Sequence, residues 1–245
     1  MKKQEFITLC LTACLIIAFQ SVQAQWGWWG NGTKGNGNVV EQKRELRDFD
    51  SVTASSGLDV YITQGNKVSV VVEADENLQN QIETVVEGNN LKLYVKGSIG
   101  RAKAMKVHVQ MPEIVAIHAS SGSDVYGENK WSGDELEIKT SGGSDVKLDL
   151  NFEHIDCITS GGSDAELSGK ASTVQLVSSG GSDIEADELV VERCAFSSSG
   201  GSDVHIYVKE HIEGSASGAS DIYLHGNPSS QQINTSGASD LHKKM

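Results

Sequence analysis

Apolar and polar residues alternate along most of the second half of the chain, and the alternation restarts about every 20 residues. Each restart is marked by a copy of the motif Ser-Gly-Gly-Ser-Asp. Nine and seven residues before the aspartate of each copy the chain is mostly apolar, and the residue between these two positions is mostly polar. An apolar residue also follows each aspartate directly. Alternation with a period of two predicts a β-strand with one buried face on each side of the motif.

The motif is the most regular feature of the sequence. Four copies read Ser-Gly-Gly-Ser-Asp, three looser copies keep the final aspartate, and successive aspartates are 18 to 21 residues apart. A fixed period of this length is typical of stacked repeat arrays, in which each unit is too small to bury its own apolar face. The aspartates of the motif are Asp124, Asp145, Asp164, Asp183, Asp203, Asp221 and Asp240.

The sequence therefore predicts an all-β protein whose residues 113–241 form a parallel β-helix, or β-solenoid, with coils of about 19–20 residues. Equivalent strands of successive coils would pair in parallel about 4.8 Å apart. In this register the bulky Phe196 lies one coil before Gly214, so we expect these two residues to pack against each other.

Residues 44–112 contain short segments of alternating or β-branched residues, separated by turns rich in glycine and asparagine. They predict a more irregular region of β-strands that belongs to the same domain. Within this region, residues 76–82 predict a short helix.

Two cysteines, Cys157 and Cys194, lie within the repeats. In the predicted register they are two coils apart, which corresponds to about 9–10 Å and exceeds the span of a disulfide. We therefore expect both cysteines to be unpaired and to serve as small buried apolar residues.

Residues 1–24 have the features of a secretory signal peptide, namely two early lysines, a long apolar run and small residues up to Ala24. The alternative is a lipobox-like stretch that ends at Cys14 and would make the chain a lipoprotein. We prefer the first interpretation because the apolar run continues past Cys14. Both interpretations predict export to the periplasm, the cell surface or the medium.

Residues 25–43 are rich in glycine and asparagine and include Trp26, Trp28 and Trp29. This composition predicts a flexible tether. The alternative is an aromatic platform for a sugar or a partner surface, because exposed tryptophans usually have a use.

The charge of the chain narrows the classes of partner. Without residues 1–24, which hold two lysines and one glutamate, 18 basic and 32 acidic side chains remain, a net charge of −14. This excess argues against nucleic acids and anionic lipid surfaces as partners. No second apolar run is long enough to span a membrane.

The order of several short motifs resembles a known family. These motifs lie at residues 47–52, 57–62, 88–91 and 107–112, and Ser-Gly-Ser-Asp corners follow them. Together they are similar to the head GIN domain of autotransporter adhesins, which is common in exported proteins of the Bacteroidetes. The resemblance covers about residues 44–240. It implies a β-helical fold and an adhesin-like role, and it brings no catalytic residues.

The repeated corner is the one candidate site. Glycines supply positive φ at tight corners, and serine and aspartate side chains bond nearby backbone groups, so a structural role comes first. The alternative role is a stripe of aspartates that binds a ligand. Unit charges 4.8 Å apart repel by about 0.9 kcal/mol in water and several times more in a protein interior, so we expect the aspartates to be exposed.

The spacing of the aspartates differs from that of calcium-binding repeats, and we predict neither a metal site nor a cofactor.

The sequence contains no Gly-x-Ser-x-Gly elbow, no His-Glu-x-x-His motif and no Walker loop. We therefore predict an exported, non-enzymatic binding module of the cell envelope, with an envelope component or a host glycan as its ligand. The alternative is a carbohydrate-active β-helix enzyme. Some parallel β-helices cleave acidic polysaccharides with clustered aspartates beside an arginine or a lysine, but Arg193 is the only arginine within the repeats.

The open end of a solenoid is a place where copies of the chain can associate. The chain ends four residues after Leu241, which is too short for another coil, and Lys243 and Lys244 lie in this tail. Because lysines deter pairing of strand edges, we expect them to guard the end.

Overall fold

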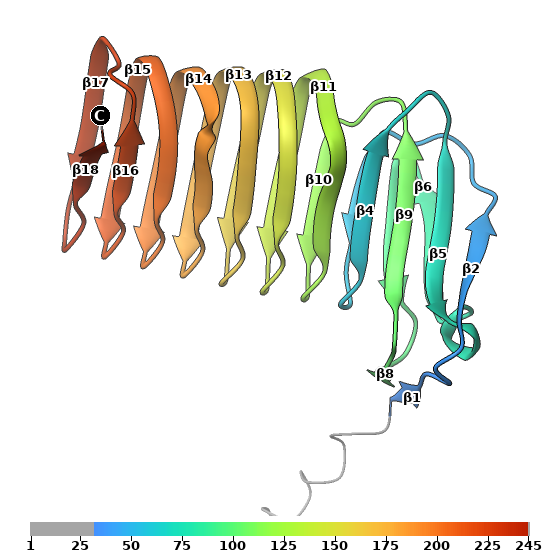
Figure 1. Ribbon diagram of the computed structural model, residues 1–245. Helices are drawn as coiled ribbons and strands as arrows, with labels where there is room; N and C mark the ends of the chain where they lie inside the picture. Colours follow the sequence, from blue (N-terminus) through green and yellow to red (C-terminus); the bar gives the residue numbers. More distant parts are fainter. Residues whose placement is uncertain (1–31, 245) are drawn as a thin grey trace, which may run out of the picture.

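The computed structural model describes residues 32–244. The predicted signal peptide, the Cys14 alternative and the three tryptophans of the predicted tether lie outside the described residues. The described part is almost entirely β-structure, and its one helical element is the 3-10 turn η1 (Glu76–Leu78), at the start of the segment predicted to be a short helix. Strands wind around a common axis as a β-solenoid, so the predicted fold class is confirmed (Figure 1).

Long, bent strands form the middle of the solenoid. Each passes along one face, turns, and continues along the other face to the next Ser-Gly-Gly-Ser-Asp corner. They pair with one another in parallel along nearly their whole length. These strands are β11 (Asp124–Ser141), β12 (Val146–Ser160), β13 (Ala165–Gly180), β14 (Ile184–Gly200) and β15 (Val204–Gly218). Shorter strands complete the last coil, namely β16 (Ile222–His225), β17 (Ser230–Thr235) and β18 (Leu241–Lys244).

The core consists of columns of apolar side chains, one residue per coil. In one column Leu176 pairs with Phe196, and Phe196 pairs with Gly214, which confirms the predicted register. Cys157 belongs to the same column and Cys194 to a neighbouring one; both are buried and unpaired, as predicted. Burial raises the pKa of each thiol to about 12, so both remain protonated apolar residues.

The solenoid extends back beyond residue 113 into the region predicted to be irregular. Four short strands of that region continue the parallel stack: β3 with β10, β4 with β11, and then β7 with β3 and β9 with β4. The coil made of β7 and β9 therefore lies outside the coil made of β3 and β4, although it follows it in sequence. The four strands are β3 (Ser51–Ala54), β4 (Asp59–Gln64), β7 (Asn90–Val95) and β9 (Met105–Met111), and their partner β10 (Ala116–Ser120) already belongs to the repeats.

Antiparallel strands close the N-terminal end of the solenoid. β5 pairs with β9, β2 pairs with β5, and β6 pairs with β7, all antiparallel. A small parallel pair, β1 and β8, lies beside them. Residues 33–34 and 39–43, which were predicted to belong to a flexible tether, lie in strands β1 and β2 instead. These strands are β1 (Thr33–Lys34), β2 (Val39–Arg44), β5 (Ser69–Asp75), β6 (Ile82–Glu87) and β8 (Ile99–Arg101).

A buried carboxylate ties the incoming chain to this cap. Asp75 is fully buried and accepts hydrogen bonds from the backbone N–H groups of Gly37, Lys103 and Ala104, at 2.5, 2.7 and 3.2 Å. Burial acts to raise the pKa of Asp75, but the backbone hydrogen bonds outweigh it and hold the pKa below its usual value. Asp75 therefore stays ionised and stabilises this junction.

Among residues 32–244, no helix is long and apolar enough to cross a bilayer.

Candidate binding face

The predicted aspartate stripe is a hydrogen-bonded seam along one edge of the solenoid. The carboxylate of each aspartate except Asp240, the last, accepts a hydrogen bond through Oδ1 from the backbone N–H of the aspartate in the next coil. Asp124 accepts from Asp145 at 3.0 Å, and Asp164 accepts from Asp183 at 3.0 Å. All six bonds of this kind measure 2.9 to 3.2 Å. The stripe therefore has the structural role that the sequence suggested first.

At five of the seven corners, the buried serine that precedes the aspartate forms a second seam in the opposite direction. Ser144 Oγ accepts the backbone N–H of Ser123 in the preceding coil at 3.1 Å, and Ser163 Oγ accepts that of Ser144 at 3.1 Å. The hydroxyls of Ser202 and Ser220 instead donate to the backbone oxygens of Ser199 and Ser217 in their own corners. Where the second seam forms, the serine side chains thus reach back one coil, whereas the aspartate side chains reach forward one coil. Each corner is held to both neighbours by side chains as well as by the backbone.

The first three corners of the repeats have two successive residues with positive φ, and the later corners have one. Gly142 and Gly143 have φ of 68° and 71°, where glycine is favoured. In the preceding corner Ser121, with φ of 57°, takes the place of the first glycine.

The stripe remains accessible although its carboxylates are bonded to the backbone. Asp145, Asp164 and Asp240 are exposed, and the other four predicted members are partly exposed. Because the seam uses Oδ1, Oδ2 lies outside it. Among the described residues, no three His, Cys, Asp or Glu side chains converge as metal ligands would.

The structure adds a member of the stripe that sequence reasoning missed. Asp59 pairs with Asp124 in the adjacent coil, although the two are 65 residues apart in sequence. Burial, and then the negative charge of Asp124, raise the pKa of Asp59. The signal in the sequence was the likeness of residues 54–57 (Ala-Ser-Ser-Gly) to residues 119–122, which lies outside the 19–20-residue period. Lys106 occupies the equivalent position beyond Asp59.

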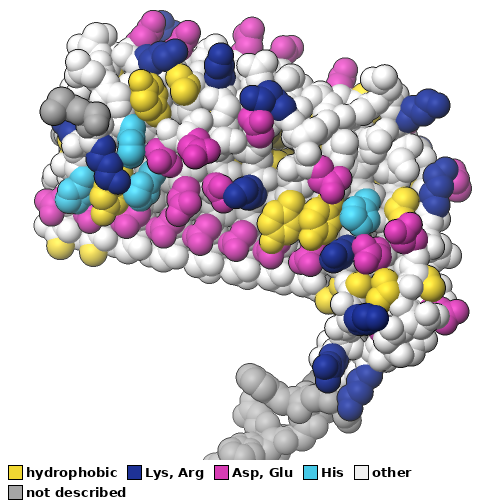
Figure 2. Space-filling model, viewed as in Figure 1, with side chains coloured by type: hydrophobic (Ala, Val, Ile, Leu, Met, Phe, Trp, Pro, Cys, Tyr) yellow, Lys and Arg dark blue, Asp and Glu magenta, His cyan; other side chains and the backbone are white. Residues whose placement is uncertain are grey.

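A second row of outward side chains runs beside the stripe, two residues after each aspartate. Its middle is charged and both of its ends are aromatic. Figure 2 shows this face, on which a line of acidic side chains runs below hydrophobic and histidine side chains. In spatial order the row is His108, Tyr61, Tyr126, Lys147, Glu166, Glu185, His205, Tyr223 and His242.

The aromatic ends of the row are stacks of rings. Tyr61 stacks on His108 and on Tyr126, with ring centroids 5.2 and 5.4 Å apart. At the other end, Tyr223 stacks between two histidine rings at 4.2 and 4.8 Å. A lysine ammonium lies over one ring of each stack: Lys106 Nζ is 5.7 Å from the centroid of Tyr61, and Lys244 Nζ is 5.1 Å from that of Tyr223.

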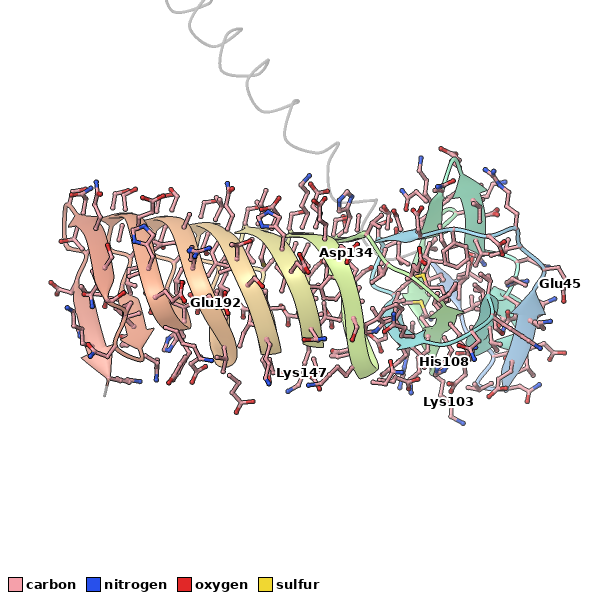
Figure 3. The ribbon with its side chains drawn as sticks, turned by 90° about the horizontal axis from the view of Figure 1, so that it is seen from above. Glu45, Lys103, His108, Asp134, Lys147 and Glu192 are labelled. Carbon is pink, nitrogen blue, oxygen red and sulfur yellow. The ribbon has the colours of Figure 1, made fainter. Side chains whose placement is uncertain are left out.

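A shallow hollow of about 230 Å³ lies between the stripe and the charged middle of the row. Lys147 Nζ is bonded to Glu166 at 2.5 Å at the edge of the hollow, and this bond raises the pKa of Lys147. Figure 3 shows Lys147 on the same long side of the molecule as His108. The polar or aromatic side chains that line the hollow are Tyr126, Asp145, Lys147, Asp164, Glu166 and Glu185.

Tyr126 stands at the end of the hollow. Its hydroxyl donates to Asp124 Oδ2 at 3.3 Å. Burial, and then the charge of Asp124, raise the pKa of Tyr126 to about 12, so its ring stays a neutral phenol.

Residues 48–228 match the family described as "Putative auto-transporter adhesin, head GIN domain". The chain belongs to this family. The resemblance inferred from the short motifs is therefore confirmed. None of the curated proteins compared with the chain is similar to it.

Solved structures share the fold of this GIN domain. A "putative adhesin" from Bacteroides fragilis NCTC 9343 is 23% identical, with a TM-score of 0.83 over 87% of this chain and 100% of that chain. A "Putative lipid binding protein" from Parabacteroides distasonis ATCC 8503 is 19% identical, with a TM-score of 0.71 over 88% and 100%. A "putative adhesin" from Parabacteroides merdae ATCC 43184 is 16% identical, with a TM-score of 0.69 over 88% and 100%. The shared fold is the β-solenoid.

On another face of the GIN domain, three side chains lie as close together as those of a hydrolytic triad, although Asp156 Oδ1 forms no hydrogen bond among the described residues. His154 Nδ1 lies 2.8 Å from Thr173 Oγ1, and His154 Nε2 lies 3.0 Å from Asp156 Oδ1. Thr173 lies in the middle of β13, which pairs with β12 on one side and β14 on the other. The backbone N–H groups around it are used in these ladders, whereas acyl transfer needs free donors for an oxyanion. The contacts alone therefore do not make a catalytic site.

A larger hollow of about 640 Å³ lies between the β9–β10 connection, residues 112–115, and residues 132–135 of β11. The side-chain amide of Gln64 ties its walls together, since Nε2 donates to the backbone oxygens of Pro112 and Ser132 at 3.0 Å each. None of the stripe or row residues lines this hollow.

Proposed function

We propose that this GIN domain is an exported, non-enzymatic binding module of the cell envelope that holds its ligand against the aspartate stripe. The observation that carries the proposal is the double use of each carboxylate. Oδ1 fixes the side chain to the next coil, and Oδ2 stays outside the seam. A ligand would meet carboxylates that are already held in place, which lowers the entropy lost on binding.

The family supports adhesion as the general role, and the charge of the face limits its ligands. One structural relative is described as a lipid binding protein. A line of carboxylates repels anionic headgroups, so we expect a neutral or cationic partner for this chain instead. An envelope component or a host glycan remains the class of ligand that we propose.

The test is a binding screen in which only the charge of the stripe changes. In the double variant Asp164→Asn/Asp183→Asn, the amide oxygen of each asparagine can still accept the hydrogen bond of the seam, while two negative charges are lost. The purified protein and the variant would be applied to arrays of glycans and of envelope fractions. We expect ligands bound by the protein to be lost from the variant, with the melting temperature nearly unchanged.

A matched control removes two exposed carboxylates away from the stripe. Glu153 and Glu192 are exposed residues of β12 and β14, and Glu153→Gln/Glu192→Gln changes the net charge by the same amount. Equal binding by the protein and both double variants would contradict the proposal. Equal losses in both variants would also contradict it, because they would point to net charge alone.

A further inference from the structure

We propose that the hollow beside Tyr126 is a seat for a primary ammonium group of the ligand. This inference rests on the proposed function and names the chemistry that the face recognises. The seat consists of the ring of Tyr126 at one end and the carboxylates of Asp145 and Asp164 along one side.

The chain itself places an ammonium group at the other two tyrosines of the row. Lys106 Nζ lies over the ring of Tyr61, and Lys106 is the strand partner of Asp59 in the parallel pair of β9 and β4. Lys244 Nζ lies over the ring of Tyr223, whose surroundings include Asp203 and Asp221. A cation over an aromatic ring is attracted by the ring quadrupole, and neighbouring carboxylates add to this attraction. A lysine ammonium therefore lies near a tyrosine ring that has aspartates as neighbours twice in this molecule.

Tyr126 has the same surroundings, but no lysine of the described chain lies over its ring. Tyr61 stacks against one side of the ring. On the other side the neighbour in the row is Lys147, and its ammonium is bonded to Glu166, which belongs to the following coil. The ring borders the hollow instead.

The charges around the hollow favour a cation. Four carboxylates line it, those of Asp145, Asp164, Glu166 and Glu185, and Lys147 is the single basic residue among the lining side chains. Asp145 Oδ1 and Asp164 Oδ1 are bonded to backbone N–H groups, which are neutral and leave the charge uncompensated. A bare metal ion would need several oxygen ligands that converge on one point, whereas an ammonium group uses a ring and separate acceptors.

Two sources present a primary ammonium group to a surface protein: the lysine side chains of a partner protein and the amino sugars of a glycan. The experiment therefore uses a probe of each kind, Nα-acetyl-lysine methylamide and a glucosamine tetramer. Each has an uncharged counterpart, in which the amine is acetylated. Binding would be followed by NMR titration of the purified protein, with tyrosine ring signals as the readout.

We expect one or both amine probes to bind at the hollow and to shift the ring signals of Tyr126, and we expect the acetylated counterparts not to bind. Tyr126→Leu should weaken binding about five- to tenfold, whereas Tyr126→Phe, which keeps the ring, should stay within about twofold. Tyr223→Leu is the matched control, because Lys244 already lies over that ring. Binding by the lysine probe alone would identify a protein partner, and binding by the glucosamine probe alone would identify a glycan.

Equal binding of acetylated and free amines would overturn the inference, as would equal weakening by Tyr126→Leu and Tyr223→Leu. The absence of binding by both amine probes would overturn it too. The array test can succeed with neutral ligands while this test fails, so the two failures are distinguishable.

Discussion

Lys243 Nζ donates a hydrogen bond of 2.6 Å to Gln231 Oε1 in the last coil. Both residues occupy columns that are apolar in earlier coils, because Gln231 pairs with Ile212 and Lys243 pairs with Leu224. Two polar side chains thus meet over the last apolar layer of the core. A charged residue that points inward at a sheet edge discourages another chain from pairing there. We therefore expect the guarding role to fall specifically to Lys243.

Replacement of this pair should turn the C-terminal end into an association surface. In Gln231→Leu/Lys243→Leu both columns become apolar again, and the free edges of β17 and β18 lose their guard. We expect an end-to-end dimer, seen as a doubled mass in light scattering. The matched control is Gln232→Leu/Lys244→Leu, which makes the same changes on the outward faces of the same strands. A monomeric Gln231→Leu/Lys243→Leu protein would show that the pair does not guard the end.

The aspartate seam should contribute to stability through its hydrogen bonds rather than its charges. Asp164→Ala removes the acceptor of the Asp183 N–H, so we expect a loss of about 1 kcal/mol in the free energy of unfolding. Asp164→Asn keeps an acceptor and should change this free energy by only a few tenths. Urea unfolding of both variants would measure the difference. Equal losses would mean that the charge, and not the acceptor, stabilises the seam.

The close approach of Gly214 to Phe196 makes this position intolerant of any side chain. A Cβ atom on Gly214 would lie 2.2 Å from the backbone oxygen of Phe196 and 2.7 Å from its ring. We expect Gly214→Ala to destabilise the protein by about 1–3 kcal/mol, because the coil must shift. Gly181→Ala is the control, since a Cβ there meets nothing within 4 Å. Thermal melting would compare them, and similar midpoints would count against the tight packing of this column.

Glycine in place of Ser121 should make the corner at residues 120–124 more stable. Ser121 has φ of 57°, where a side chain is disfavoured and the equivalent residue Gly142 is not strained. We expect Ser121→Gly to stabilise the protein by roughly 0.5–1 kcal/mol in denaturant unfolding. The reverse test is Gly143→Ala, at φ of 71° in open space, where the strain acts alone and should lower stability by about 1 kcal/mol. Opposite signs for the two variants are the expected result.

Asp75 should make the cap sensitive to acid. Its pKa is lowered in the folded protein by three backbone N–H groups. Its contribution is therefore complete above the unfolded pKa of about 3.9 and is lost as the pH falls through the lower folded value. Asp75→Asn should reduce stability at pH 7 and flatten the decline in stability below about pH 4. Unfolding measured at several pH values would show this, and parallel curves for the two proteins would exclude a role for this carboxylate.

The regular part of the fold could be predicted from the sequence because a single period governs it. Residues that share a column, such as Cys157 and Phe196, recur at nearly constant spacing, so counting was enough. The coil that contains Asp59 was missed because 65 residues separate it from its neighbour Asp124. Strand β6 was missed because its start at Ile82 was assigned to the end of a predicted helix.

Only one half of the candidate site, the aspartate stripe, could be predicted from the period of the sequence. The aspartates are marked by their motif, whereas the row two residues further on has no common residue type. Tyr223 and Lys147 become equivalent only when the coils are stacked. Contacts such as that of Lys244 with Tyr223 depend on side-chain directions, which periodicity does not contain.

The order of the coils in space has a consequence for how the chain folds. From β11 to β15, paired residues are about 20 positions apart, so each new coil closes a short loop on one already formed. The pairing of β4 with β11 must instead close a loop of 65 residues, which contains the whole coil of β7 and β9. We expect the repeats to form by local growth along the axis, while the cap requires a distant segment to return. The addition or loss of one repeat would lengthen or shorten the solenoid without altering the cap. The length of the binding face is therefore a variable that evolution can adjust one coil at a time.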